Sequence, residues 1–130
     1  MNDAPRLYRL IVQVNDLDRA ATFYAALLGA PGRHVPGRRH YFDCGDVILA
    51  VVDTGRDARP LPDHLYFSVR DLDAAYARAK ELGCLAAGEV HGEPAGEIRT
   101  RPWGERCFYA TDPFGNPLCF VDELTLYTGR

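Results

Sequence analysis

The chain has 130 residues, of which 47% are hydrophobic and 25% are charged, as in an ordinary globular protein. Its net charge of −3 and its lack of a basic helix or aromatic–basic platform argue against nucleic-acid binding. No apolar run approaches the ~20 residues that a membrane-spanning helix needs.

The beginning of the chain and its cysteines indicate where the protein resides. Residues 1–5 are polar and acidic, unlike an export signal. The four cysteines, Cys44, Cys84, Cys107 and Cys119, form no C-x-x-C pair. We therefore expect reduced thiols and a cytoplasmic location.

A short segment of the chain is repeated. Residues 14–20 return as residues 69–75, with five of seven identical at an offset of 55. In each copy, alternating apolar residues predict a strand before the repeat, and an apolar stripe at helical spacing predicts a helix within and after it. An aspartate can cap each helix start, and Gly29 and Gly83 stand where a left-handed residue ends a helix. The repeat predicts two copies of one supersecondary unit.

Further strands complete each copy. The first copy continues with strands over residues 40–44 and 47–53, and a linker rich in proline, glycine and charge covers residues 54–63. In the second copy, residues 97–101 are extended, and strands at 105–111 and 117–121 flank a type I turn, Asp112-Pro113-Phe114-Gly115. Each module is predicted as strand–helix–strand–strand–strand.

Three motifs resemble the vicinal oxygen chelate superfamily, which includes glyoxalase I, extradiol dioxygenases and bleomycin-resistance proteins. The motifs are V-x-D-L-x-x-A-x-x-F-Y-x-x-L-L-G at residues 14–29, Trp103-Gly104-x-Arg106 and Asp112-Pro113-x-Gly115-Asn116. The resemblance implies an α+β fold in which two tandem βαβββ modules form a curved, cleft-bearing mixed sheet with the helices outside. It covers one domain, residues 1–130, with modules at about 7–53 and 64–123.

The first strand of each module has a second, mixed face. We expect these two faces to converge on one ligand-binding cavity. The predicted ligand-binding residues are Arg9, Gln13, His64, Tyr66, Trp103, Arg106 and Cys119.

Five of these residues also have a purely structural interpretation. His64 can be a hydrogen-bonded strand residue, Arg9 can pair with a carboxylate, and Trp103 can cover the core. Arg106 can face solvent, and a buried Cys119 can be an inert hydrophobic residue.

The resemblance also concerns metal binding. In the family's metal-dependent members, the metal ligands come from the first and last strands of each module. The residues at these positions here are Arg9, Leu49 or Ala50, His64 and Cys119. Only His64 matches, since a guanidinium cannot ligate and aliphatic side chains have no donor. We therefore predict neither a metal nor another cofactor, and catalytic residues are not identified.

Three functional hypotheses follow. In the first, a homodimer binds a small organic molecule in a metal-free cleft, as the bleomycin-resistance proteins do. In the second, the chain is an enzyme: a metal-dependent lyase or dioxygenase with a non-standard ligand set, or an acid–base catalyst using His64. In the third, the chain has no ligand and is either a structural relic or a partner-binding domain. The sequence leaves open whether there is any catalysis.

Overall fold

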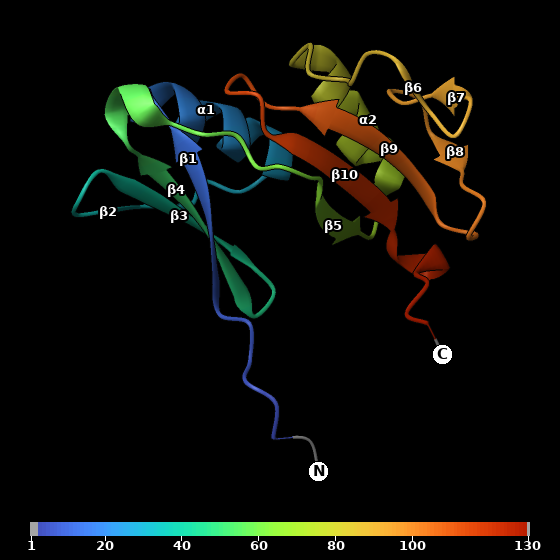
Figure 1. Ribbon diagram of the computed structural model, residues 1–130, viewed down its shortest axis with the longest axis horizontal. Helices are drawn as coiled ribbons and strands as arrows, with labels where there is room; N and C mark the ends of the chain where they lie inside the picture. Colours follow the sequence, from blue (N-terminus) through green and yellow to red (C-terminus); the bar gives the residue numbers. More distant parts are fainter. Residues whose placement is uncertain (1–2, 130) are drawn as a thin grey trace.

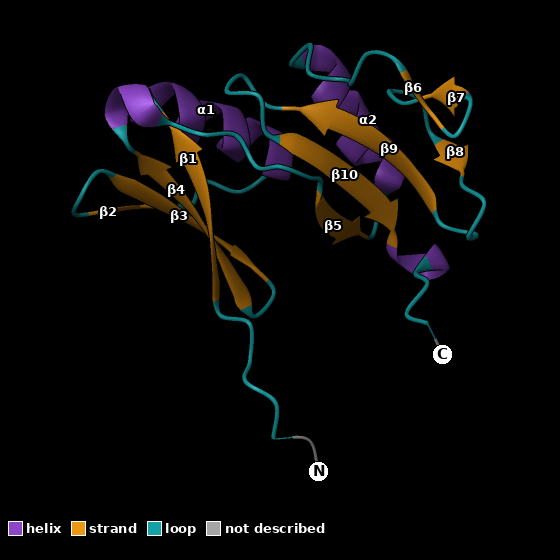
Figure 2. Ribbon diagram, in the orientation of Figure 1, coloured by secondary structure: helices purple, strands orange, loops and turns teal. Residues whose placement is uncertain are grey.

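The computed structural model describes residues 3–129 and contains two four-stranded mixed sheets and two α-helices (Figures 1 and 2). The first sheet has the order β1-β4-β3-β2 and the second β5-β10-β9-β8. The first module consists of β1 (Arg9–Val14), α1 (Leu17–Leu28), β2 (Arg33–Val35), β3 (Arg39–Cys44) and β4 (Val47–Asp53). A 3₁₀ turn, Gly55–Asp57, lies in the segment between the modules.

The second module repeats this order. It contains β5 (Leu65–Val69), α2 (Leu72–Glu81), β8 (Arg99–Thr100), β9 (Arg106–Thr111) and β10 (Pro117–Asp122), followed by a 3₁₀ turn at Glu123–Thr125. A small hairpin of β6 (Glu89–Val90) and β7 (Glu93–Pro94) is inserted before β8.

The strand registers match between the modules. In the first, β1 runs parallel to β4, with Leu10 opposite Leu49. In the second, β5 runs parallel to β10, with Leu65 opposite Leu118. Because Leu65 lies 55 residues after Leu10, the sequence repeat coincides with an equivalent place in the sheet. The prediction of an α+β fold with two βαβββ modules is confirmed.

The helix boundaries follow from local chemistry. Asp16 accepts a hydrogen bond from the Arg19 amide at the start of α1, and Asp71 accepts one from the Ala74 amide at the start of α2. These bonds satisfy amide groups that have no partner within the helix. Gly29 ends α1 in the left-handed conformation, as predicted, with φ of 70°.

The helices form a layer over one face of both sheets. Figure 1 shows α1 above the first sheet and α2 behind β9 and β10 of the second, and the two helices contact each other. One apolar core joins this layer to both sheets, through residues such as Tyr24, Phe42, Ala75 and Phe120. The opposite, far face of the second sheet carries a separate small cluster, Ala95, Cys107, Tyr109, Cys119 and Val121.

A buried polar cluster ties the modules together. The Tyr24 hydroxyl on α1 donates a 2.6 Å hydrogen bond to Asp112 at the end of β9. Asp112 also accepts from the amides of Phe114 and Asn116 and from the Asn116 side chain. The Asn116 side-chain oxygen in turn accepts from the Leu61 amide. The Asp-Pro-x-Gly-Asn motif therefore fixes the last hairpin and the contact between the modules.

Several details differ from the expectations. The sheet consists of two separately hydrogen-bonded halves, since no ladder joins β1 to β5 in residues 3–129. Strand β2 and the β6–β7 hairpin were not predicted, because both are very short and lie in segments rich in glycine. None of the helices over residues 3–129 is long and apolar enough to span a membrane.

Replacing Gly115 by valine is expected to lower the free energy of unfolding by roughly 1–3 kcal/mol, because a β-branched residue is strained at positive φ. Gly115 has φ of 88°, as the predicted turn requires. Thermal unfolding followed by circular dichroism measures the change. Asparagine tolerates this conformation, so Gly115→Asn is the matched control. An unchanged melting temperature in the valine variant would contradict the prediction.

Candidate functional site

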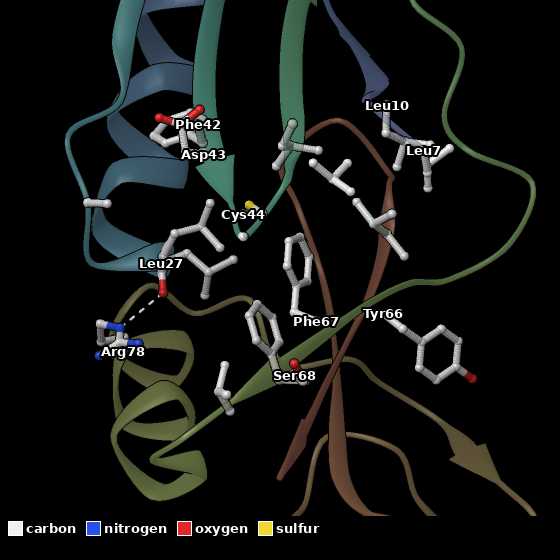
Figure 3. Close-up of a pocket in the computed structure, with 18 residues that line it drawn as sticks. Leu7, Leu10, Leu27, Phe42, Asp43, Cys44, Tyr66, Phe67, Ser68 and Arg78 are labelled. Atoms are coloured by element: carbon white, nitrogen blue, oxygen red, sulfur yellow. Dashed lines mark hydrogen bonds between the residues drawn. The ribbon is translucent and has the colours of Figure 1, made fainter. Parts of the chain in front are cut away.

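A pocket of about 450 Å³ lies between the two modules, on the helix side of the sheets (Figure 3). It is lined by the start of β1, the end of α1, the β3–β4 hairpin and β5, together with Arg78 of α2 and Phe120 of β10. Leu10, Leu27, Phe42, Leu49 and Phe67 are among the apolar side chains that line it. Its position follows from the fold, because the two sheets diverge from a shared helix layer and leave a gap between the core-facing sides of the strands.

Glycine turns shape the wall of the pocket. Gly29 ends α1 and turns the chain so that Ala30 lines the pocket immediately beyond the helix. At the tip of the β3–β4 hairpin, Gly45 has φ of 62° and also lines the pocket. These turns place backbone without bulky side chains beside the apolar wall.

A few polar groups face this apolar wall. The Arg78 Nε group donates a 3.0 Å hydrogen bond to the Leu27 carbonyl, drawn as a dashed line in Figure 3. The Asp43 carboxylate accepts from Arg33 at 2.8 Å. Burial, and then the neighbouring Asp43 charge, raise the pKa of the Cys44 thiol, which therefore stays protonated at neutral pH. Ser68 and Tyr66 complete the polar set.

Arg9 and Gln13 lie on the far face of the first sheet, outside this pocket. The Arg9 guanidinium lies 3.4 Å from the Tyr41 hydroxyl, which also accepts from Arg39 at 3.0 Å. The hydrogen bond from Arg39 is the main cause that lowers the pKa of Tyr41. Gln13 accepts a hydrogen bond from the Arg59 amide, so it fastens the segment between the modules.

Tyr66 lies on β5 of the second sheet, and His64 immediately precedes this strand. The His64 ring packs edge-on against Tyr109 at 4.8 Å, and its Nδ1 lies 3.2 Å from the Asp63 carboxylate. Tyr66 is 54% exposed, and Figure 3 shows its ring extending away from Phe67 at the rim of the pocket. Partial burial is the largest cause that raises the pKa of Tyr66.

The prediction that the mixed faces converge on one cavity is wrong for the single chain. Arg9 begins β1 of the first sheet, whereas His64, 55 residues later, immediately precedes β5 of the second. Of the predicted set only Tyr66 lines the pocket, whose walls are mainly the apolar faces of the strands.

The remaining predicted residues lie elsewhere. Arg106 is on the helix side of β9, where it forms ion pairs with Asp73 at 3.4 Å and Asp122 at 3.5 Å. Trp103 donates to Glu105 at 2.7 Å and packs against His91. Cys119 is fully buried in the far-face cluster of the second sheet. None of the three lines the pocket.

The residues at the family's metal-ligand positions do not fit a metal. Register places Ala50 opposite Ile11 and Cys119 opposite Tyr66, so Ala50 is the equivalent of Cys119. The four positions therefore offer a guanidinium, a methyl group, one imidazole and one buried thiol, on two sheets. Across residues 3–129 there is no group of three or more His, Cys, Asp or Glu side chains that could hold an ion. This donor set cannot complete a coordination shell.

The chain is similar to a known protein family and to several solved structures. The model of the Glyoxalase/Bleomycin resistance protein/Dioxygenase superfamily matches residues 6–120. A solved structure named Oxidase ChaP-H1 is 30% identical with a TM-score of 0.78, covering 97% of this chain and 100% of its own. A glyoxalase/bleomycin resistance protein from Albidiferax ferrireducens T118 is 25% identical with a TM-score of 0.72, covering 90% and 98%.

A more distant structure shares the fold. Lactoylglutathione lyase from Agrobacterium tumefaciens is 21% identical with a TM-score of 0.67, covering 93% of this chain and 96% of its own. The search of curated proteins found no match.

Proposed function

Since the chain belongs to the Glyoxalase/Bleomycin resistance protein/Dioxygenase superfamily, we propose that it binds a small organic molecule in the pocket between its modules, without a catalytic metal. The observation that carries this proposal is the pocket of about 450 Å³, which is mainly apolar and has a few polar groups. Pockets of ~300–1,000 Å³ with this lining, placed between structural units, are typical small-molecule sites. The ligand that fits is largely apolar, with one polar group for Ser68 or Arg78.

Thermal-shift measurements with a panel of small aromatic and aliphatic compounds test this proposal. A compound that binds only the folded chain raises its stability, by about 2.7 kcal/mol at a concentration 100 times the dissociation constant. We expect apolar compounds with one hydrogen-bonding group to raise the melting temperature most. A panel in which no such compound stabilises the protein would count against the pocket as a binding site.

A second candidate is an enzyme of the same superfamily. The 30% identity with a protein named as an oxidase, over nearly the whole chain, favours oxidase activity on a small molecule. A metal-dependent lyase or dioxygenase with a non-standard ligand set is the other form of this candidate. His64 is the residue on which a metal or an acid–base role would depend.

Protein purified without chelators is expected to contain no stoichiometric zinc, nickel, iron or manganese. The reason is the donor set, in which a guanidinium, Arg9, stands at a ligand position. Its fixed charge would repel a cation ~4 Å away by about 4 kcal/mol for each positive charge on that cation, at an effective dielectric constant of 20. Elemental analysis of the wild type and of His64→Ala measures this. Stoichiometric metal that disappears in the His64 variant would support the enzyme instead.

We also propose that the chain forms a two-fold homodimer in the cytoplasm. Strands β1 and β5 are edge strands, and exposed apolar side chains, Tyr8, Ile11 and Tyr66, lie on or beside them. Uncovered edges with apolar side chains favour association. All four thiols are unpaired, as in proteins of a reducing compartment.

Ile11→Glu is expected to convert the dimer into a monomer, because it buries a charge at the β1 edge. Light scattering at micromolar concentration measures the mass. Leu124→Glu, at a more exposed residue of the C-terminal segment, is the matched control and should leave the dimer intact. A wild-type monomer at this concentration would refute the dimer.

A further inference from the structure

The far-face cluster of the second sheet contains a buried charge. Arg101 is only 2% exposed, although it lies among apolar residues and two fully buried cysteines, Cys107 and Cys119. Ala95, just after the β6–β7 hairpin, belongs to this cluster, and Ala86 and Val90 of β6 pack against it. A buried guanidinium is costly unless an anion compensates it.

The contacts of Arg101 contain no carboxylate. Its Nε group donates to the Cys107 Sγ atom at 3.3 Å, and Nη2 donates to the backbone carbonyls of Glu97 at 3.2 Å and Cys107 at 3.4 Å. The guanidinium lies 5.0 Å from the centre of the Tyr109 ring. Nη1 is buried and has no hydrogen-bond partner among residues 3–129.

The nearest acidic side chains in the sequence are engaged elsewhere. The Glu97 carboxylate pairs with Arg99 at 3.0 Å. The Glu105 carboxylate accepts from the Trp103 ring nitrogen at 2.7 Å and from the Tyr127 amide at 2.9 Å. Within residues 3–129, the only group in hydrogen-bond contact with the guanidinium that can become an anion is therefore the thiol of Cys107.

We propose that Cys107 is held as a thiolate by Arg101 and is the site at which this chain reacts with hydroperoxides. The thiolate sulfur attacks one peroxide oxygen, so that the O–O bond breaks and an S–O bond forms. Cys107 is oxidised to a sulfenic acid, and the peroxide is reduced to an alcohol, or to water when it is hydrogen peroxide, after its leaving oxygen takes a proton from solvent.

The electrostatics of the four thiols agree with this assignment. The hydrogen bond from Cys119 and then the interactions with Arg101 lower the pKa of Cys107 to about 6, against the opposing effect of burial. Burial instead raises the pKa of Cys84 to about 11, and it also raises the pKa of Cys44. Cys107 is thus the one thiol whose neighbours favour the reactive, ionised form at neutral pH.

Access of a peroxide to the buried Cys107 thiol depends on local opening of the short segment that packs over it. Strands β6 and β7 have two residues each, and a two-stranded ladder this short is only marginally stable. Behind the hairpin, the Tyr109 amide donates to the Ala95 carbonyl at 2.9 Å and the Ala95 amide to the Gly88 carbonyl at 3.0 Å. Breaking these few bonds opens the cluster locally without unfolding the sheet.

The test treats the full chain with hydrogen peroxide in excess dimedone, which captures sulfenic acids, and maps the modified peptides from about pH 5 to about pH 9. We expect Cys107 to react first, with a midpoint near pH 6. A Cys107–Cys119 disulfide, formed when the sulfenic acid condenses with the Cys119 thiol and releases water, counts as the same reaction. Cys44 is the more exposed thiol, so its modification before Cys107 would overturn the proposal.

Variants show whether Cys107 reacts because its thiol is ionised or only because it is accessible. Arg101→Gln should raise the midpoint and slow the reaction at about pH 7 roughly tenfold, since less of the thiol is ionised. Cys119→Ala, which removes the second donor and retains Arg101, should raise the midpoint in a folded chain. Cys84→Ala is the matched control and should change neither the pH midpoint nor the rate of the reaction. A midpoint in the wild type near that of an ordinary thiol, ~8.5, would refute the proposal even if every variant misfolds.

Discussion

Replacing Asp112 by alanine is expected to lower the free energy of unfolding by roughly 3–5 kcal/mol, because several buried donors lose their acceptor at once. Asp112 is 4% exposed and accepts from the Tyr24 hydroxyl, two backbone amides and the Asn116 side chain. The Tyr24 bond joins residues 88 positions apart, so its loss also weakens the contact between the modules. Urea denaturation followed by circular dichroism measures the change.

Two further variants provide reference values for the loss of stability in Asp112→Ala. Tyr24→Phe removes one donor from the same cluster and should cost roughly 1–2 kcal/mol. Asp73→Ala removes an aspartate whose side chain is 78% exposed, and should change the stability by less than about 0.5 kcal/mol. If Asp112→Ala were no more destabilising than Asp73→Ala, the buried cluster would not hold the modules together.

Filling the pocket should abolish small-molecule binding. Ala30 lines the pocket just after α1, and a tryptophan at this position would occupy much of the available volume. Ala30→Trp is expected to weaken the binding of anilinonaphthalene sulfonate, a fluorescent apolar dye, by roughly tenfold or more, which equals about 1.4 kcal/mol. A fluorescence titration of the folded variant measures the dissociation constant.

The control for this variant lies one helical turn away. Ala26 is exposed on α1 and does not line the pocket, so Ala26→Trp adds the same side chain at a position outside the pocket. The dye should bind Ala26→Trp as it binds the wild type. Equal binding by both tryptophan variants would place the dye elsewhere on the molecule.

Much of the fold was accessible from local patterns. The repeated Val-x-Asp-Leu-Asp segment places a strand end and a helix cap at equivalent points of each module, and Asp16 and Asp71 both cap as predicted. The turn at Asp112–Gly115 could also be predicted, because proline fixes φ near the value that the turn needs and glycine readily adopts positive φ. Short strands such as β2 were missed because their pairing depends on a neighbour rather than on their own residues.

The candidate site was harder to predict because it depends on how the modules pack. Alternation places Arg9 on the opposite face from the core-facing Leu10, and His64 packs on Tyr109 of the far-face cluster, but the pattern does not say whether two such faces meet. In the single chain they belong to separate sheets, and the pocket opens on the apolar side. For Arg106 a signal was present: Phe108, two residues on, belongs to the helix-side core, so Arg106 shares that side.

Native mass spectrometry of the protein, purified without chelators and released from its host under mild conditions, tests the central proposal most directly. We expect a non-covalent organic molecule that leaves on denaturation, is retained by Ala26→Trp and is lost in Ala30→Trp, and we expect no stoichiometric metal. A transition metal bound at one ion per chain and lost in His64→Ala, with no organic mass in the pocket, would contradict the account.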